Sequence, residues 1–168
     1  RLIKGWDIQD INQEQASSDA ISWFENKLNQ TIEDINNSYD KYRISEALMT
    51  TYKLIWDDFC SIYLEIIKPD YQKPIDTKTY NQTIIFLEDV LKLLHPFMPF
   101  LTEEIYHNIP HTDTSDALTI SSWPANEKYL SSVVDEFEIT KEIISHIRNY
   151  RKEKNISFKT SLDLYYLP

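Results

Sequence analysis

The sequence predicts an all-α protein, an antiparallel bundle of about five helices. The 168 residues include one glycine, where average usage would supply about twelve. Parallel βαβ folds and phosphate-binding loops need glycines in their tight turns, so both are disfavoured. Apolar residues recur at steps of three and four over long stretches, the spacing of amphipathic helices. Prolines stand where these stretches end, as they do at helix boundaries.

The first two helices are expected to be long. The first begins at a cap on Ser17 or Ser18. The second runs from about residue 44 to residue 68, where Pro69 ends it. It has two apolar stripes side by side, and so wide an apolar surface predicts neighbours on two sides. The second of these stripes passes through Met49, Trp56, Cys60, Tyr63 and Ile67.

The next two helices are shorter. Asp76 can cap a third helix, which ends at Pro96. Pro99 suits the first turn of a short fourth helix, because proline is tolerated there. This fourth helix is expected to continue to about Asn108, before Pro110.

A long loop follows the fourth helix, since residues 111–126 are rich in Thr, Ser, Asp and Pro. Residues 118–120 are expected to be extended within it. A fifth helix should run from about residue 132 to residue 154. The tail over residues 161–167 alternates apolar and polar side chains, which predicts a short terminal strand.

The charge balance is strongly acidic. With 17 basic and 27 acidic residues the formal charge is −10, which normally argues against a nucleic-acid partner. The distribution is uneven, because the window from Lys141 to Lys159 contains six basic residues and two acidic ones. This window alone carries +4 and is the strongest electrostatic feature of the chain.

Several classes of protein are excluded by composition. No apolar run approaches the roughly 20 residues of a membrane span, and no signal-peptide pattern opens the chain. The single cysteine, Cys60, excludes a disulfide framework and a thiolate zinc cluster. Its place on an apolar stripe predicts a buried, unreactive thiol.

Catalytic carboxylates are not expected. The adjacent pairs Asp57–Asp58 and Glu103–Glu104 point about 100° apart on a helix, so neither pair converges on one substrate. Solvated faces or dipole partners at helix starts are predicted for both. His95, which precedes a proline, is expected to be a helix-end residue rather than a general base.

A metal site is not expected either. Glu103, His107 and His111 are spaced at four-residue intervals that could hold a metal. Pro110, however, interrupts the helix between the two histidines. We therefore predict no metal ligand and no catalytic residue in this chain.

The segment from Arg148 to Asn155 holds the strongest candidates for contact with nucleic acid. Arg148 and Lys152 are four residues apart and share a helix face, where they could contact phosphates. Basic side chains in a last turn also complement the helix dipole, so solvation of the helix end stays open as the alternative. Tyrosines with basic neighbours could stack on unpaired bases, and these are Tyr39, Tyr42 and Tyr150.

Two segments resemble the helical bundle of class I aminoacyl-tRNA synthetases of the Val/Ile/Leu/Met group. One is LLHPFMPFLTEEIY, residues 93–106, and the other begins KYRISEAL at Lys41 and ends WDDFCSIYLE at Glu65. The hexapeptide HPFMPF, the opening RLIKGW and the later segment IRNYRKEKNI are most similar to the valyl members. Ile62 departs from the pattern, because many members have tryptophan there.

The resemblance implies an anticodon-binding domain from a cytoplasmic, ATP-dependent enzyme that joins valine to its tRNA. Residues 1–16 would link it to a preceding catalytic body, residues 17–156 would form the bundle, and residues 157–168 would begin the following module. The expected partner is a tRNA for valine, not DNA or a membrane. The two adenylate-forming signatures of the class, HxGH and KMSKS, are absent from the chain. ATP, magnesium and valine would therefore be bound by the rest of the enzyme, with no cofactor in this segment.

The expected binding site follows from the helix directions. If successive helices run away from the catalytic body and back, the turn after the first helix lies at the far end, and the basic end of the fifth helix could fall at the same pole. The predicted nucleic-acid-binding residues are Lys41, Tyr42, Arg43, Arg148, Tyr150, Arg151 and Lys152. Two alternatives remain, the same domain of an isoleucyl or leucyl enzyme and a helical protein-interaction module.

Overall fold

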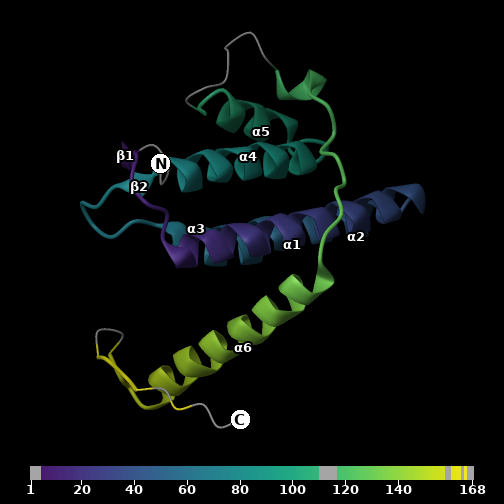
Figure 1. Ribbon diagram of the computed structural model, residues 1–168. Coiled ribbons are helices and arrows are strands. Elements are labelled where there is room, and N and C mark those ends of the chain that lie inside the picture. Colours follow the sequence, from purple (N-terminus) through teal and green to yellow (C-terminus); the bar gives the residue numbers. More distant parts are fainter. Residues whose placement is uncertain (1–4, 110–116, 158–159, 164, 166–168) are drawn as a thin grey trace. The chain divides into compact units, whose positions relative to one another are not determined.

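The structure is a computed structural model that describes residues 5–109, 117–157, 160–163 and 165 (Figure 1). It confirms the predicted all-α class, since the regular structure of the described residues is helical apart from two strands of two residues each. The chain divides into two compact units, residues 1–131 and residues 132–168. The module boundaries predicted after residues 16 and 156 stay predictions.

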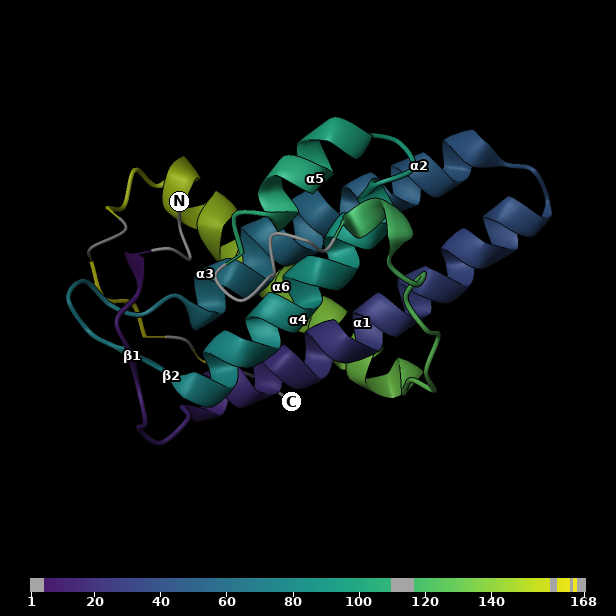
Figure 2. The same cartoon turned by 90° about the horizontal axis from the view of Figure 1, so that it is seen from above.

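Within the first unit, the helical runs alternate in direction (Figures 1 and 2). α1 runs away from the two strands, a second run returns, α4 runs away again and α5 returns, as the sequence predicts. The α1–α2 turn therefore lies at the end of this unit opposite the strands. The runs are α1 (Gln15–Asp40), the continuous run of α2 (Ile44–Lys53), η2 (Leu54–Tyr63) and α3 (Leu64–Ile67), then α4 (Thr77–Leu94) and α5 (Pro99–Tyr106).

The helix starts follow the capping predictions in part. Asp76 caps α4 as predicted, because its Oδ1 accepts the backbone N–H three residues later at 2.8 Å. α1 begins at Gln15, after Glu14, whose backbone is extended and whose side chain makes no capping bond. The predicted cap on Ser17 or Ser18 is wrong, since the helix has already formed there and Ser17 is buried in it.

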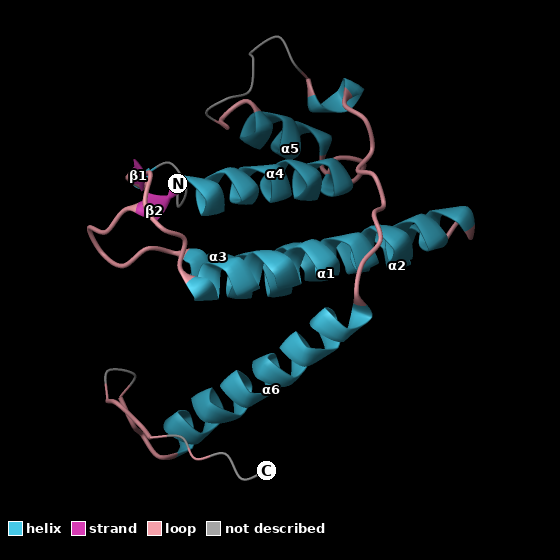
Figure 3. Cartoon of the chain, viewed as in Figure 1, coloured by secondary structure: helices cyan, strands magenta, loops and turns pink. Residues whose placement is uncertain are grey.

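Two short parallel strands close one end of the first unit (Figure 3). β1 (Ile8–Gln9) lies in the segment predicted as a linker, and it pairs with β2 (Ile75–Asp76), Ile8 opposite Ile75. The N–H of Ile75 donates to the carbonyl of Asp7 at 2.8 Å. A strand of two residues has no periodicity to detect, which is why the sequence does not predict it.

The core of the first unit is aromatic. The ring of Phe24 contacts the rings of Phe59, Tyr63 and Phe86, with centroid distances of 5.2, 5.0 and 5.1 Å. Trp23 is fully buried beside it. These rings come from α1, η2 and α4, so the three helical runs meet at Phe24.

The π-helix η2 changes which residues face the core. Its buried residues recur at the wider spacing of a π turn, and they are Leu54, Asp58, Phe59 and Tyr63. Two predictions are wrong here for the same reason: Asp58 is buried rather than solvated, and Cys60 is exposed rather than buried. Trp56, on the predicted second apolar stripe, is 60% exposed.

The long loop contains one helical turn. η3 (Leu118–Ile120) is a 3₁₀ helix, so the predicted extended segment is wrong. The backbone N–H groups of Leu118 and Thr119 donate to the Glu103 carboxylate at 2.9 and 3.3 Å. This carboxylate satisfies the first N–H groups of the turn, which favours a helical over an extended backbone.

The second unit consists of α6 and the tail. α6 (Ser131–Glu153) agrees with the predicted fifth helix to within one residue at each end. The described tail residues 161–163 and 165 do not form the predicted strand, and Leu164 and residues 166–168 lie outside the described residues. In the part of the chain that the structure describes, no helix is both long and apolar enough to cross a membrane.

Candidate nucleic-acid interface

The turn Lys41–Arg43, between α1 and α2, contains three of the predicted site residues. Its hydrogen bonds are those of a Schellman cap: Tyr42 N–H donates to the Tyr39 carbonyl at 2.9 Å, and Arg43 N–H donates to the Ser38 carbonyl at 2.8 Å. These bonds end α1 and let α2 begin at once. Because the backbone makes the cap, the three side chains are not needed for it.

Tyr42 has an unusual backbone conformation. Its φ is +57°, in the left-handed region, which costs a residue with a Cβ roughly 1–2 kcal/mol. Its side chain is 90% exposed, so packing does not repay that cost. Its ring is therefore accessible to solvent, as a side chain that stacks on an unpaired base has to be.

The charges beside this turn are mixed. A shallow hollow next to it is lined by Lys41 and Arg43 and also by Asp34 and Glu46. The Arg43 guanidinium lies 3.4 Å from the Glu46 carboxylate, with side-chain exposures of 58% and 60%. An ion pair this exposed contributes little, so a phosphate can replace Glu46 as the partner of Arg43.

The other predicted site residues lie at the end of α6. This helix also ends in a Schellman cap, with Asn155 at φ +52° and the Ile156 N–H donating to the Arg151 carbonyl at 2.9 Å. Arg148 and Lys152 are exposed and share one face of the helix. They form a small positive surface suited to phosphate oxygens.

Arg151 and Tyr150 each interact with a residue near the end of α6. Arg151 Nη1 donates to the Ser157 carbonyl at 2.8 Å, so part of its guanidinium already holds the chain after the helix. Tyr150 is 53% exposed, and the Lys154 ammonium lies 5.9 Å from its ring centroid. A base that stacks on Tyr150 would meet this ammonium group as well.

The predicted site residues therefore form two groups. One group, Lys41 to Arg43, belongs to the first unit, and the other, Arg148 to Lys152, belongs to the second unit. Each group is contiguous within its own unit. That the two groups share one pole stays a prediction.

Tyr39 is packed rather than presented to solvent. Its ring lies 6.5 Å from that of Phe97 and 5.8 Å from that of Trp123, centroid to centroid. Burial raises the pKa of its phenol. Of the tyrosines with basic neighbours, Tyr42 and Tyr150 remain the ones that could stack on a base.

His95 joins three elements, as expected of a helix-end residue. It follows the last residue of α4, its Nδ1 lies 2.8 Å from the Thr102 hydroxyl of α5, and its Nε2 lies 3.1 Å from the Thr119 hydroxyl of η3. Both ring nitrogens are therefore engaged in structural hydrogen bonds, and neither is presented to a substrate.

Glu103 and His107, the described members of the weak metal pattern, are 3.3 Å apart. The third member, His111, lies outside the described residues. Among the described residues, no group of three or more His, Cys, Asp or Glu side chains could hold a metal ion. The carboxylate of Glu103 is occupied by the backbone of η3.

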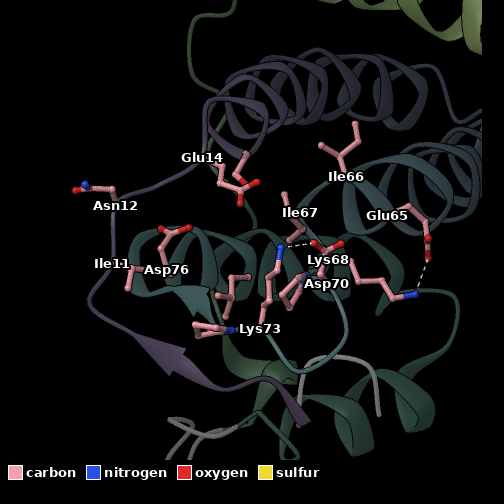
Figure 4. Close-up of a pocket in the computed structure, with 14 residues that line it drawn as sticks. Ile11, Asn12, Glu14, Glu65, Ile66, Ile67, Lys68, Asp70, Lys73 and Asp76 are labelled. Carbon is pink, nitrogen blue, oxygen red and sulfur yellow. Dashed lines mark hydrogen bonds and ion pairs between the residues drawn. The ribbon is translucent and has the colours of Figure 1, made fainter. Parts of the chain in front are cut away.

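A hollow at the strand end of the first unit was not predicted from the sequence (Figure 4). It has a volume of about 310 Å³, and its lining includes Glu14, Lys68, Asp70 and Lys73. Lys73 and Asp70 form an ion pair of 2.6 Å. The turn beside it exposes Tyr71 to 91%. The lining comes from residues 11–17 and 65–76, which are far apart in the sequence, so no local pattern predicts the hollow.

Comparison with known proteins identifies relatives over nearly the whole chain. The family model for the anticodon-binding domain of tRNA ligase matches residues 22–166. The chain is 48% identical over 164 residues to the valine–tRNA ligase of Christiangramia forsetii and 46% identical over 165 residues to that of Parabacteroides distasonis. It is 34% identical over 168 residues to that of Anoxybacillus flavithermus. These alignments cover 97–98% of the chain but 19% of each relative.

Proposed function

The chain belongs to the family of anticodon-binding domains of tRNA ligases, and on that premise we propose that it binds the anticodon region of a tRNA for valine. The relatives that support the choice of amino acid are named valine–tRNA ligases. The chain spans about a fifth, 19%, of the length of these relatives. Its task is thus to position tRNA for chemistry that the rest of the enzyme performs.

The enzyme as a whole is, on this proposal, an ATP-dependent valine–tRNA ligase of the cytoplasm. The adenylate-forming signatures of the class are absent from these 168 residues. ATP, magnesium and valine are therefore assigned to the remainder of the protein. No residue of this chain is given a role in bond making or breaking.

One observation carries the proposed contacts, the strained and exposed Tyr42 between two basic residues. Its ring stacks on an unpaired base of the anticodon loop, and Lys41 and Arg43 contact the flanking phosphates. Arg148, Tyr150, Arg151 and Lys152 add a second group of contacts through the end of α6. Phosphate contacts and stacking both provide affinity, whereas discrimination between anticodons requires hydrogen bonds to the edges of the unpaired bases.

The test is a titration of the full-length protein with tRNA for valine and with the same tRNA carrying a different anticodon, at two salt concentrations. The substitutions Lys41→Ala, Tyr42→Ala and Arg43→Ala together should weaken binding of the native tRNA at least about fivefold, since removing one base stack alone costs about 1–3 kcal/mol. Equal binding of the two tRNAs by the wild-type protein would contradict anticodon recognition.

The opposite end of the first unit offers a matched control. Lys68→Ala, Tyr71→Ala and Lys73→Ala remove the same kinds of side chain, including a tyrosine 91% exposed. This variant should bind tRNA as the wild type does. If it loses affinity and the Lys41–Arg43 variant does not, the interface lies at the strand end, and the assignment of Tyr42 is wrong.

A further inference from the structure

A stripe of polar side chains on α1 holds the segment that leads into α6. This segment, residues 121–130, is called the strap here; it contains no helix or strand and is mostly exposed. Asn26 Oδ1 accepts the N–H of Leu130 at 2.7 Å, and Asn29 Oδ1 accepts the N–H of Glu127 at 2.9 Å. Two of its backbone N–H groups are thereby satisfied by α1.

Two further bonds extend the stripe toward the end of α1. Glu33 Oε2 accepts the hydroxyl of Tyr129 at 2.9 Å, and Asn36 Oδ1 accepts the indole N–H of Trp123 at 3.0 Å. Positions 26, 29, 33 and 36 are separated by steps of three and four, so the four acceptors share one face of the helix. We call these four residues the α1 stripe.

The side-chain amides of Asn26 and Asn29 are oriented by hydrogen bonds within α1 itself. Asn26 Nδ2 donates to the Ser22 carbonyl at 2.7 Å, and Asn29 Nδ2 donates to the Glu25 carbonyl at 3.0 Å. Each amide is thus held by its own helix with its oxygen left to accept from the strap. Asn29 is 8% exposed, so its oxygen would lose a hydrogen bond in a mostly dry place if the strap moved away.

The hydrogen bond to Leu130 lies directly before α6 and next to the boundary between the two units. Leu130, held by Asn26, is the residue before the first residue of α6, and the boundary between the two units follows Ser131. Before the strap, Glu103 and His95 hold Leu118 and Thr119. The strap is therefore held by α1 at Leu130, and η3, which precedes it, is held by Glu103 and His95.

We propose that the α1 stripe positions α6 for tRNA binding. By holding Leu130 it fixes the point at which the chain leaves the first unit, and so limits how far from that unit the basic end of α6 can reach. This inference rests on the proposed role of that basic end in RNA contact. Asn26 and Asn29 are positioning residues, because they act through the strap.

The test compares three variants of the full-length protein. Asn26→Ala with Asn29→Ala removes both acceptors, and Asn26→Asp with Asn29→Asp keeps an oxygen acceptor at each position. Asn37→Ala is the matched control, an exposed asparagine of α1 outside the stripe. Hydrogen exchange at the amides of Glu127 and Leu130 should be about tenfold faster in the alanine variant, since both lose their acceptors.

Positioning is measured without tRNA. Spin labels on Cys60 and on Glu142→Cys, in a background with the remaining cysteines of the protein replaced, report the distance between the first unit and α6. The alanine variant should broaden this distance distribution, while the aspartate variant and Asn37→Ala should retain the wild-type width. An unchanged distribution in the alanine variant would overturn the proposal.

Binding of tRNA then tests the functional link. The alanine variant should bind about fivefold more weakly, within the range of typical coupling energies, and the aspartate variant should restore affinity. A broadened distribution with unchanged affinity would show that the stripe does not serve RNA binding. If the wild-type protein binds no tRNA, the proposed function fails, and the distance measurement alone decides whether the stripe positions α6.

Discussion

Among the described residues, left-handed backbone conformations fall on residues other than glycine. The single glycine, Gly5, does not have one, whereas Tyr42, Gln72 and Asn155 have φ values of +57°, +63° and +52°. Two of these residues, Tyr42 and Asn155, follow the last turns of α1 and α6, next to the two groups of predicted site residues. Asparagine tolerates this conformation well, but tyrosine does not. The backbone conformation of Tyr42 is therefore unfavourable, and no packing of its exposed side chain compensates for it.

The substitution Tyr42→Gly should separate strain from function. Glycine adopts the left-handed conformation without steric cost, although it loses more chain entropy on folding, so the free energy of unfolding should rise by about 0.5–1 kcal/mol. Binding of tRNA should weaken at the same time, because the ring is gone. Urea unfolding and tRNA titration of the same preparation measure both. A variant that is less stable than the wild type would show that the tyrosine ring packs in solution.

Tyr63 gives the first unit a dependence on alkaline pH. Burial raises the pKa of its phenol above the usual value of 10.0, and the hydroxyl shares a 2.8 Å hydrogen bond with Thr83. Above pH 10 the unfolded chain ionises this group while the folded chain keeps it neutral, so stability falls as pH rises. We expect Tyr63→Phe to unfold with a shallower loss of stability between about pH 10 and pH 12. An equal loss in both proteins would assign the effect to other groups.

At the scale of elements, most helices and their stops follow from apolar spacing and proline. α4, α5 and α6 begin within one residue of their predicted starts, because Asp76 before α4, Pro99 at the start of α5 and the serine pair at the start of α6 are local signals. η2 was not predictable, since its ten residues have an ordinary helical pattern and the wider turn is set by packing. The burial of Asp58 and exposure of Cys60 were missed for that reason.

The cap of α4 should contribute measurably to stability. Asp76 is 5% exposed and accepts one of the otherwise unpaired N–H groups of the helix start. Asp76→Ala should lower the free energy of unfolding by about 1 kcal/mol, within a range of roughly 0.5–2. Asp57→Ala, an exposed aspartate in η2, should change it by less than about 0.5 kcal/mol. Chemical denaturation measures the free energy of unfolding of both variants. An equal loss in the two would show that the effect does not come from the cap.

The candidate site, which involves both units, was only partly predictable from the sequence. Basic residues near Lys41 and Arg148 stand out in a chain of charge −10, so both groups could be named. The ion pair of Arg43 with Glu46 and the bond of Arg151 to Ser157 were not foreseeable, because they depend on side-chain geometry. The α1 stripe was missed because its partners lie 87 to 104 positions away.

The salt dependence of tRNA binding tests the second group of basic residues. Arg148→Ala with Arg151→Ala should weaken binding and reduce the slope of log affinity against log salt by about 0.7–0.9 for each phosphate that the protein no longer neutralises. Lys53→Ala with Lys78→Ala removes two other exposed charges and should leave the slope unchanged. If both double variants reduce the slope equally, net charge rather than a local interaction governs binding.

The pairing of β1 with β2 has a consequence for the order of folding. Ile8 and Ile75 are 67 positions apart, so their contact closes a loop that contains α1 and the whole α2–η2–α3 run. The entropy of closing so long a loop is unfavourable until the helices inside it have collapsed. This small sheet should therefore form after the aromatic core around Phe24, and it should be among the first contacts to open when the first unit unfolds.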